Sequence, residues 1–253
     1  MHHSAHAKES ARNSGPIRRL VMLLLRGILA LLLGLLFVIV MFRWLPVPYS
    51  SLMLQRWFAA QVDGESDFAL RQRWRPLSAI SPHAALAVVA SEDQKFPFHY
   101  GFDLEAIDKA MEDNPHRKRP RGASTISQQV AKNLFLWPGR SFVRKGIEAG
   151  ITVLLEGLWP KARILEVYLN VAEFGSGIFG VEAASQAFFH KSAAKLNQAE
   201  AAILAAILPS PLRSSAMRPS AYISERAWHI QRQMRQLGGI GYLGEILPGK
   251  HKD

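Results

Sequence analysis

The sequence contains no cysteine, which excludes a catalytic thiolate, zinc fingers, iron–sulfur clusters and disulfide bonds. Acidic residues are few, because 20 Asp and Glu stand against 31 Lys and Arg and give a net charge of +11. Such an excess suits an anionic partner, whether nucleic acid, an anionic membrane surface or a phosphorylated substrate. Strand-like alternation is also scarce, and from Pro82 onward the apolar periodicity is mostly helical. The 253 residues have room for one substantial domain or at most two small ones.

The longest apolar run lies near the N-terminus. Leu20–Phe42 contains 23 residues and a single charge, Arg26. Because roughly 20 apolar residues cross the hydrocarbon layer, this run predicts a transmembrane helix, with Arg26 extending toward the headgroups or the span continuing past Arg43. A secretory signal peptide is the alternative interpretation. The exit Arg43–Pro48 has no small-x-small cleavage site, which favours an uncleaved anchor.

Positive charge around the span predicts its orientation. The cations that precede or begin it are Lys8, Arg12, Arg18, Arg19 and Arg26, against Glu9 alone. The positive-inside rule then keeps the N-terminus in the cytoplasm and places the rest of the chain across the membrane. We expect a cytoplasmic tail (1–19), a transmembrane anchor (20–45), a juxtamembrane connection (46–63), one mainly α domain (64–245) and a C-terminal tail (246–253).

Periodicity and capping signals predict the helices of this domain. The expected helices span residues 84–91, 104–111 with Asp103 as cap, a segment that begins after Thr125, 141–157, 161–170 and 201–208. Thr125 with Gln128, and Asn197 with Glu200, have the spacing of capping boxes. Pro160 suits the first turn of the helix 161–170.

Residues 114–147 hold no acid, although an even spread would place about three there. The cations of this basic stretch are Arg117, Lys118, Arg119, Arg121, Lys132, Arg140, Arg144 and Lys145. A solvated basic face is the ordinary explanation. Two features favour convergence of these cations in space. The cations are divided among a loop and two helices, and the turn Gly122–Thr125 opens a helix whose free backbone amides suit phosphate. The stretch therefore favours a clamp for a diphosphate.

Carboxylates flank the basic stretch. Glu92 and Asp93 end an apolar helix, where an acidic pair is ordinarily a solvated terminus. Glu148 shares a helix face with Arg144 and Lys145, and a surface ion pair is its ordinary interpretation. Acids beside a cationic cradle also suit glycosyl chemistry on a sugar diphosphate. One acid would remove the proton of an acceptor hydroxyl while the cations neutralise the departing diphosphate.

Five segments resemble, in order, the motifs of the peptidoglycan glycosyltransferases, glycosyltransferase family 51. Glu92–Asp103 is similar to the family signature E-D-x-x-F-x-x-H-x-G-x-D, and Gly122–Asn133 resembles the second motif. Arg144–Glu148 matches the third, R-K-x-x-E, while Ile164–Ala184 and Glu200–Pro209 resemble the fourth and fifth. The motifs cover about half of the chain, so chance agreement is negligible.

The resemblance implies a lysozyme-like, mainly α glycosyltransferase domain with a membrane-proximal, partly hydrophobic subdomain and, in this chain, one N-terminal transmembrane helix. It also implies the reaction, in which lipid II is the acceptor and a lipid-linked glycan strand is the donor. A β-1,4 bond replaces an α-diphosphate, so the donor carbon inverts and undecaprenyl diphosphate leaves. Too few residues follow Pro211 for a penicillin-binding transpeptidase domain, so the chain is most similar to the monofunctional members.

Site residues are carried over by position in these motifs. The resemblance implies that Glu92 is the general base and that Glu148 is a second catalytic glutamate, which orients or stabilises the diphosphate region. The implied substrate-binding residues are Ser124, Thr125, Gln129, Lys132, Arg140 and Lys145. The expected supporting residues are Asp93, Phe96, His99, Asp103 and Asn170. A core histidine and a helix cap are the simpler interpretations of His99 and Asp103.

The resemblance implies lipid II, the lipid-linked glycan strand and membrane lipids as partners, with cell-division or wall-synthesis proteins as candidates and no nucleic acid. It places the protein in the bacterial inner membrane as a single-pass protein, with a cytoplasmic N-terminus and a periplasmic catalytic domain. The sequence requires no cofactor or metal, although a divalent cation could assist the diphosphate. Two alternatives stay open: a lysozyme-like hydrolase or lytic transglycosylase, whose acid must protonate a glycosidic oxygen, and an anchored scaffold without catalysis.

Overall fold

The computed structural model describes residues 5–113, 122–139 and 141–247. The chain divides into two compact units, Met1–Leu45 and Pro46–Asp253. The first unit contains α1 (Ala5–Phe42), whose segment Ile17–Phe42 is long and apolar enough to cross a membrane. It is the one candidate span in the described part of the chain. Its leucines are exposed along the helix, as expected where lipid is the solvent.

The second unit is mainly helical. Its α-helices are α2 (Ser51–Val62), α3 (Pro82–Glu92), α4 (Leu104–Asp113), α5 (Ile126–Phe135), α6 (Phe142–Leu158), α7 (Lys161–Val171), α8 (Val181–Phe189), α9 (Gln198–Ile207) and α10 (Ala221–Gln236). Single 3-10 turns lie at Leu77–Ala79, Ala193–Lys195 and Gly239–Leu243. The mainly α fold expected from the sequence is therefore confirmed.

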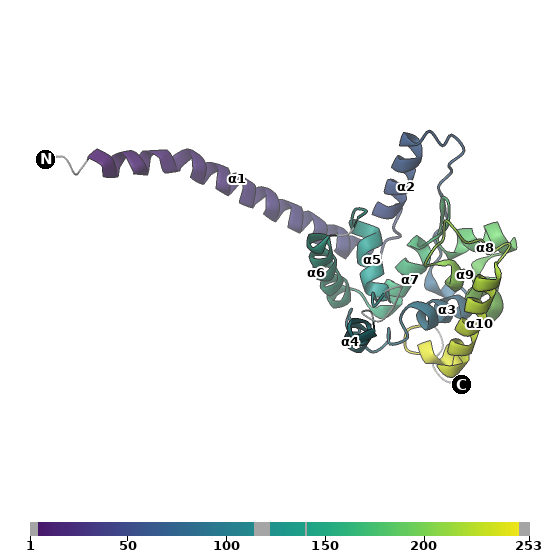
Figure 1. The fold of residues 1–253 in the computed structure, drawn as a ribbon. Coiled ribbons are helices and arrows are strands. Elements are labelled where there is room, and N and C mark those ends of the chain that lie inside the picture. Colours follow the sequence, from purple (N-terminus) through teal and green to yellow (C-terminus); the bar gives the residue numbers. More distant parts are fainter. Residues whose placement is uncertain (1–4, 114–121, 140, 248–253) are drawn as a thin grey trace. The chain divides into compact units, whose positions relative to one another are not determined.

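The core of this unit forms around α3 and α5. Every residue of α3 from Ala84 to Ala90 is buried, and the helix packs against α9 and α10 (Figure 1). A helix that is apolar on all sides is stable only when it is surrounded, which explains its central place. α5 packs against α6 and α7, and also contacts α2. The end of α3 and the first turns of α5 then position the functional side chains.

A small sheet closes one side of the unit. β1 (Arg71–Gln72) runs parallel to β3 (Ile178–Phe179), and β3 pairs antiparallel with β2 (Glu173–Gly175). Arg71 lies opposite Ile178, and the turn before this pair brings Gly177 against the chain at Ala69. A Cβ on Gly177 would lie 2.3 Å from the Ala69 carbonyl oxygen, and its φ is +68°, so glycine is required there.

The observed helices agree with the predicted ranges to within three residues. Thr125 and Asn197 cap α5 and α9 through capping boxes, as predicted. Pro160 is the N-cap of α7 rather than a residue of its first turn, which corrects that prediction. α2, α8 and α10 were not predicted. The buried face of α10 consists only of Ile223, Ala227, Ile230 and Met234, so a mostly polar sequence hides its helical spacing.

Candidate active site

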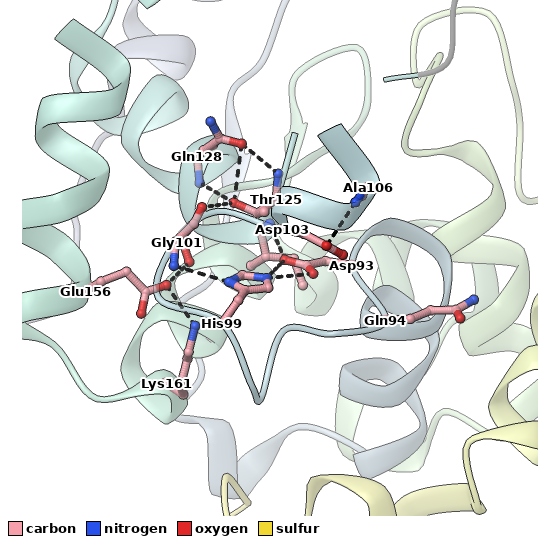
Figure 2. Close-up of polar contacts among 12 residues, drawn as sticks. Asp93, Gln94, His99, Gly101, Asp103, Ala106, Thr125, Gln128, Glu156 and Lys161 are labelled. Carbon is pink, nitrogen blue, oxygen red and sulfur yellow. Dashed lines mark hydrogen bonds and ion pairs between the residues drawn. The ribbon is translucent and has the colours of Figure 1, made fainter. Parts of the chain in front are cut away.

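Side chains from two segments fix the N-terminus of α5 (Figure 2). Oγ1 of Thr125 accepts a hydrogen bond from the Gln128 amide at 3.2 Å, and Gln128 Oε1 accepts one from the Thr125 amide at 3.0 Å. The Thr125 hydroxyl also donates to the Gly101 carbonyl at 2.6 Å. The hydrogen bond from Thr125 to Gly101 forms a joint between α5 and the loop that follows α3. Thr125 was expected to bind substrate, and its hydroxyl takes part in this joint.

Asp93 is the buried carboxylate at that joint, with 6% of its surface exposed. It accepts hydrogen bonds from His99 Nε2 at 2.9 and 3.1 Å and from the backbone amide of Ile126 at 2.9 Å (Figure 2). His99 Nδ1 accepts the Gly101 amide at 3.1 Å, which assigns the ring proton to Nε2. A carboxylate is favoured at a helix N-terminus, where free amides gather. Asp93 and His99 thus join the end of α3, the loop and α5.

Phe96 is a buried aromatic residue of the same loop. Its ring is fully buried, and the Lys161 ammonium lies 4.5 Å from the ring centroid. Lys161 also pairs with Glu156 at 2.8 Å, and Glu156 accepts a hydrogen bond from the Ser127 hydroxyl. Glu156 therefore has partners different from those of Glu148.

Asp103 and Asn170 have structural contacts. Asp103 accepts a hydrogen bond from the Ala106 amide at 3.0 Å, so it caps α4, as predicted. Asn170 is buried and binds Arg75 on both sides of its amide, donating to the backbone oxygen at 2.8 Å and accepting from the backbone nitrogen at 2.7 Å. These bonds hold the segment before α3 against α7. They place Asn170 in the framework of the fold.

Glu92 ends α3 with 15% of its side chain exposed. Its Oε2 accepts a hydrogen bond from Gln129 Nε2 at 3.0 Å, and its Oε1 accepts one from the Ser91 hydroxyl at 3.2 Å. Nη2 of Arg226, from α10, lies 3.7 Å from Oε1. Glu92 also lines a cavity of about 240 Å³ that includes Ser124. The carboxylate is held by these hydrogen bonds, and Glu92 belongs to the lining of this cavity.

Glu148 is buried, with 3% of its surface exposed. Its carboxylate accepts hydrogen bonds from Arg144 Nη1 at 3.1 Å and from the Lys145 ammonium. A surface ion pair, the ordinary interpretation of this spacing, is therefore wrong. Lys145 Nζ also lies 3.5 Å from the Ser124 hydroxyl, which connects α6 to the turn before α5.

Lys132 interacts electrostatically with both glutamates. The pKa of Lys132 is lowered, chiefly because the surrounding protein removes water from its ammonium, although the residue also exposes surface to solvent. The negative charges of Glu148 and Glu92 raise the pKa of Lys132. The positive charges of Arg144 and Lys145 lower it further. Lys132 is thus the cation whose surroundings include Glu92 on α3 and the charged cluster on α6.

A second cavity, of about 510 Å³, opens beside these cations. Lys132 and Arg144 line it together with the apolar side chains of Leu52, Leu136 and Trp137. Its wall therefore passes from positive charge to apolar surface. Such a wall suits a molecule with an anionic group attached to a hydrocarbon chain.

The structure brings Glu92, Gln129, Lys132, Lys145 and Glu148 into one region, and the roles that the resemblance implies for them stay predictions. Arg140 and the cations Arg117, Lys118, Arg119 and Arg121 lie outside the described residues, so their contacts with substrate stay predictions. No group of three or more His, Asp or Glu side chains is arranged to hold a metal ion in the described part of the chain. Assistance by a divalent cation also stays a prediction.

Sequence reasoning missed two residues beside the carboxylate. Arg226 approaches Glu92 from α10, and Tyr168 of α7 donates a hydrogen bond to Gln129 Oε1 at 3.1 Å. The spacing of the buried face of α10 was the signal available for the helix that carries Arg226. Tyr168 was visible as a tyrosine beside Val167 and Leu169, but nothing in the sequence shows what its hydroxyl meets.

Replacing Asp93 with Asn should destabilise the protein by about 2 kcal/mol, because the NH₂ group that replaces one oxygen cannot accept from the His99 N–H and the negative charge at the N-terminus of α5 is lost. Asp103→Asn is the matched control, since Asn caps a helix as well as Asp does. Urea unfolding of the detergent-solubilised chain, followed by circular dichroism, compares the two variants. Equal stability of both would contradict the role given to the Asp93 joint.

Comparison with known proteins covers most of the chain. The sequence model of the family described as Transglycosylase matches residues 61–235. A biosynthetic peptidoglycan transglycosylase of Cronobacter sakazakii is 53% identical over 90% of this chain and 94% of its own length. Proteins of the same name from Salmonella agona and Citrobacter koseri are 53% and 55% identical, over 92% and 81% of this chain and 97% and 85% of their own lengths. The chain therefore belongs to the Transglycosylase family, the glycosyltransferases of peptidoglycan synthesis.

Proposed function

We propose that the protein polymerises lipid II into β-1,4-linked glycan, with Glu92 as general base. The acceptor 4-hydroxyl gives its proton to Glu92 as its oxygen forms a bond to C1 of the donor sugar. The bond from C1 to the diphosphate breaks, and its electron pair leaves with undecaprenyl diphosphate. Attack opposite the leaving group inverts the donor carbon. The observation that carries this proposal is the hydrogen bond from Gln129 to Glu92, which joins the carboxylate to the helix that also carries Lys132.

The surroundings of Glu92 support its role as base. A general base must reach the proton it removes and must be held in one orientation. Gln129 and Ser91 lie at hydrogen-bond distance from the two oxygens of Glu92, and Glu92 is one of the residues that line a cavity. The acceptor sugar would occupy that cavity, with its hydroxyl against the carboxylate.

The cations support departure of the diphosphate. Negative charge grows on the leaving oxygens in the transition state, and fixed positive charge stabilises it most where water is excluded. Lys132 and Lys145 supply ammonium groups on α5 and α6, and Ser124 lies beside Lys145. Glu148 fixes Arg144 and Lys145, so its role is to orient the cations rather than to react. We include Arg140 in this clamp from its place in the motif.

The second cavity supports a lipid-linked donor. The first isoprene units of the lipid would lie against Leu52, Leu136 and Trp137, next to the phosphates at Lys132. Trp137, in the loop before α6, and Phe142 and Val143, in the first turn of α6, are exposed apolar side chains. Large exposed apolar side chains in a cluster mark a surface that meets lipid or protein. We propose that this surface meets membrane lipids.

We further propose that α1 anchors the enzyme in the bacterial inner membrane with its N-terminus in the cytoplasm and its catalytic domain in the periplasm. Arg18, Arg19 and Arg26 lie at the N-terminal part of the candidate span, the side that positive residues keep cytoplasmic. The glycan product belongs on the opposite side. Proteins of cell division or wall synthesis remain candidate partners there.

Glu92→Gln should abolish polymerisation of labelled lipid II by the detergent-solubilised chain, because an amide cannot take the hydroxyl proton. Binding of lipid II and the unfolding midpoint should stay close to those of the wild type. Glu105→Gln is the matched control, since Glu105 is an exposed carboxylate that pairs with Lys95. Products are separated by size.

Each product pattern of this assay has one meaning. Long glycan from the wild type and none from Glu92→Gln support the proposal. Turnover retained by Glu92→Gln contradicts the assignment of the base. Shortening of added glycan would instead indicate a hydrolase, and binding of lipid II without any product would indicate a scaffold.

Lys132→Arg should extend activity to higher pH. Because the pKa of Lys132 is lowered, its ammonium loses the proton at a lower pH than an ordinary lysine, and diphosphate binding falls as pH rises through that value. A guanidinium stays charged over this range. The alkaline limb of kcat/KM against pH, which reports groups of the free enzyme, should therefore move upward. Lys191→Arg is the control, because Lys191 is paired with Glu200. If the alkaline limb of kcat/KM does not move in Lys132→Arg, Lys132 does not belong to the clamp.

A further inference from the structure

Gln129 connects Glu92 to a buried hydroxyl. Its Nε2 donates to Glu92 Oε2 at 3.0 Å, and its Oε1 accepts from the Tyr168 hydroxyl at 3.1 Å. The three residues come from α5, α3 and α7, so the connection crosses three helices of the core. Both ends of the Gln129 side chain are therefore occupied. This was not expected for a residue assigned to substrate contact.

The direction of these hydrogen bonds follows from the carboxylate. An ionised carboxylate only accepts, so Gln129 must turn its NH₂ group toward Glu92. Its carbonyl oxygen then faces Tyr168, and the hydroxyl must donate. Every donor in the series Tyr168, Gln129, Glu92 thus points toward the carboxylate. Neighbouring bonds that point the same way polarise and strengthen one another.

Tyr168 is the buried residue whose hydroxyl is the first donor in this series of hydrogen bonds. It is 1% exposed and lies on α7, where Ile164, Leu165 and Leu169 are also fully buried. Burial raises the pKa of Tyr168 well above its ordinary value, and the charges of Glu92 and Asp93 raise it further. The hydroxyl therefore keeps its proton and stays a donor at every pH at which the enzyme would work.

We propose that Tyr168 is a positioning residue that acts through Gln129 to orient Glu92, and that Oε1 of Glu92 is the oxygen that takes the proton. This inference rests on the proposed function of Glu92 as base. Oε2 is committed to Gln129, whereas Oε1 has the Ser91 hydroxyl at 3.2 Å and Arg226 at 3.7 Å. The Ser91 hydroxyl can rotate away, which leaves Oε1 open to an acceptor hydroxyl.

A simpler explanation is that Gln129 only satisfies a buried hydroxyl. In that case loss of the hydroxyl would alter stability and leave the chemistry of Glu92 unchanged. The alternative is a relay, in which Tyr168 orients Glu92 through Gln129. In this relay, loss of the Tyr168 hydroxyl frees the Gln129 amide to turn, and Glu92 loses a donor that favours its ionised form. The two explanations differ in kcat and in the pH profile, which folding stability does not control.

The test is a double-mutant cycle of Tyr168→Phe and Gln129→Met in the full-length enzyme, with lipid II polymerisation as the assay. Both substitutions keep the size of the side chain and remove the hydrogen bonds. We expect each to lower kcat about tenfold, with KM changed less than about twofold. The double variant should lose no more than the Gln129→Met single variant, because residues that act in series are not additive.

The pH profile gives a readout that a structural role would not move. The acidic limb of kcat/KM should shift to higher pH in both single variants, since Glu92 holds a proton more readily without its donor. Among the described residues, the charged groups around Glu92 include Arg226, Lys132 and its neighbour Asp93, and none of them is altered in the cycle. Tyr242→Phe is the matched control, because its hydroxyl donates to the Gln94 carbonyl at 2.6 Å and has no bond to Gln129 or Glu92. Its profile should match that of the wild type.

Each failure has a separate meaning. Unchanged kcat and pH profile in Tyr168→Phe, with an active wild type and an inactive Glu92→Gln, overturn the relay alone. Additive losses in the double variant overturn it as well, because Tyr168 would then act by another route. If the wild type makes no glycan, or Glu92→Gln keeps its activity, the proposed function fails and the relay fails with it. Should Tyr168→Phe not fold, Gln129→Met still tests the link to Glu92, and an unchanged acidic limb in that variant overturns the relay.

Discussion

The bond between the Asp93 carboxylate and the first amide of α5 is the joint on which the site depends. Asp93 lies directly after Glu92, so a hydrogen bond from Ile126 sets how far the end of α3 stands from α5. Gln129 and Lys132 follow one turn and two turns later on the same helix. The distance from the proposed base to the cations of α5 is therefore set by Asp93, a carboxylate outside the proposed chemistry. His99 keeps that carboxylate in one orientation.

The site also shows how like charges can be gathered without loss of the fold. Arg144 and Lys145 are neighbours on α6, and Lys132 faces them from α5. Glu148, buried beneath them, offsets part of their repulsion and fixes their direction. A buried carboxylate is costly unless it is paired, and here two cations pair with it. The remaining positive charge is left for a ligand that brings its own negative charge.

Much of the fold was predictable because its local signals agree with one another. Capping boxes at Thr125 and Asn197, and the apolar run of α3, each specify one helix without help from distant residues. α10 was missed because its buried stripe is narrow, and the joint at Asp93 was missed because a carboxylate beside a helix end has no sequence signature of its partner. The motif resemblance named the site residues but could not separate those that line the cavity from those that hold the frame. Thr125 and Gln129 belong in part to the frame, and only coordinates reveal that.

The place of α10 in the order of synthesis has a consequence for biogenesis. Arg226 and Gln233 stand beside Glu92 and its cavity, yet they belong to the last long helix of the chain. A ribosome has therefore made nine-tenths of the polypeptide before the neighbourhood of Glu92 can be completed. The lining of the cavity beside Glu92 is therefore complete only when nearly the whole polypeptide has been made.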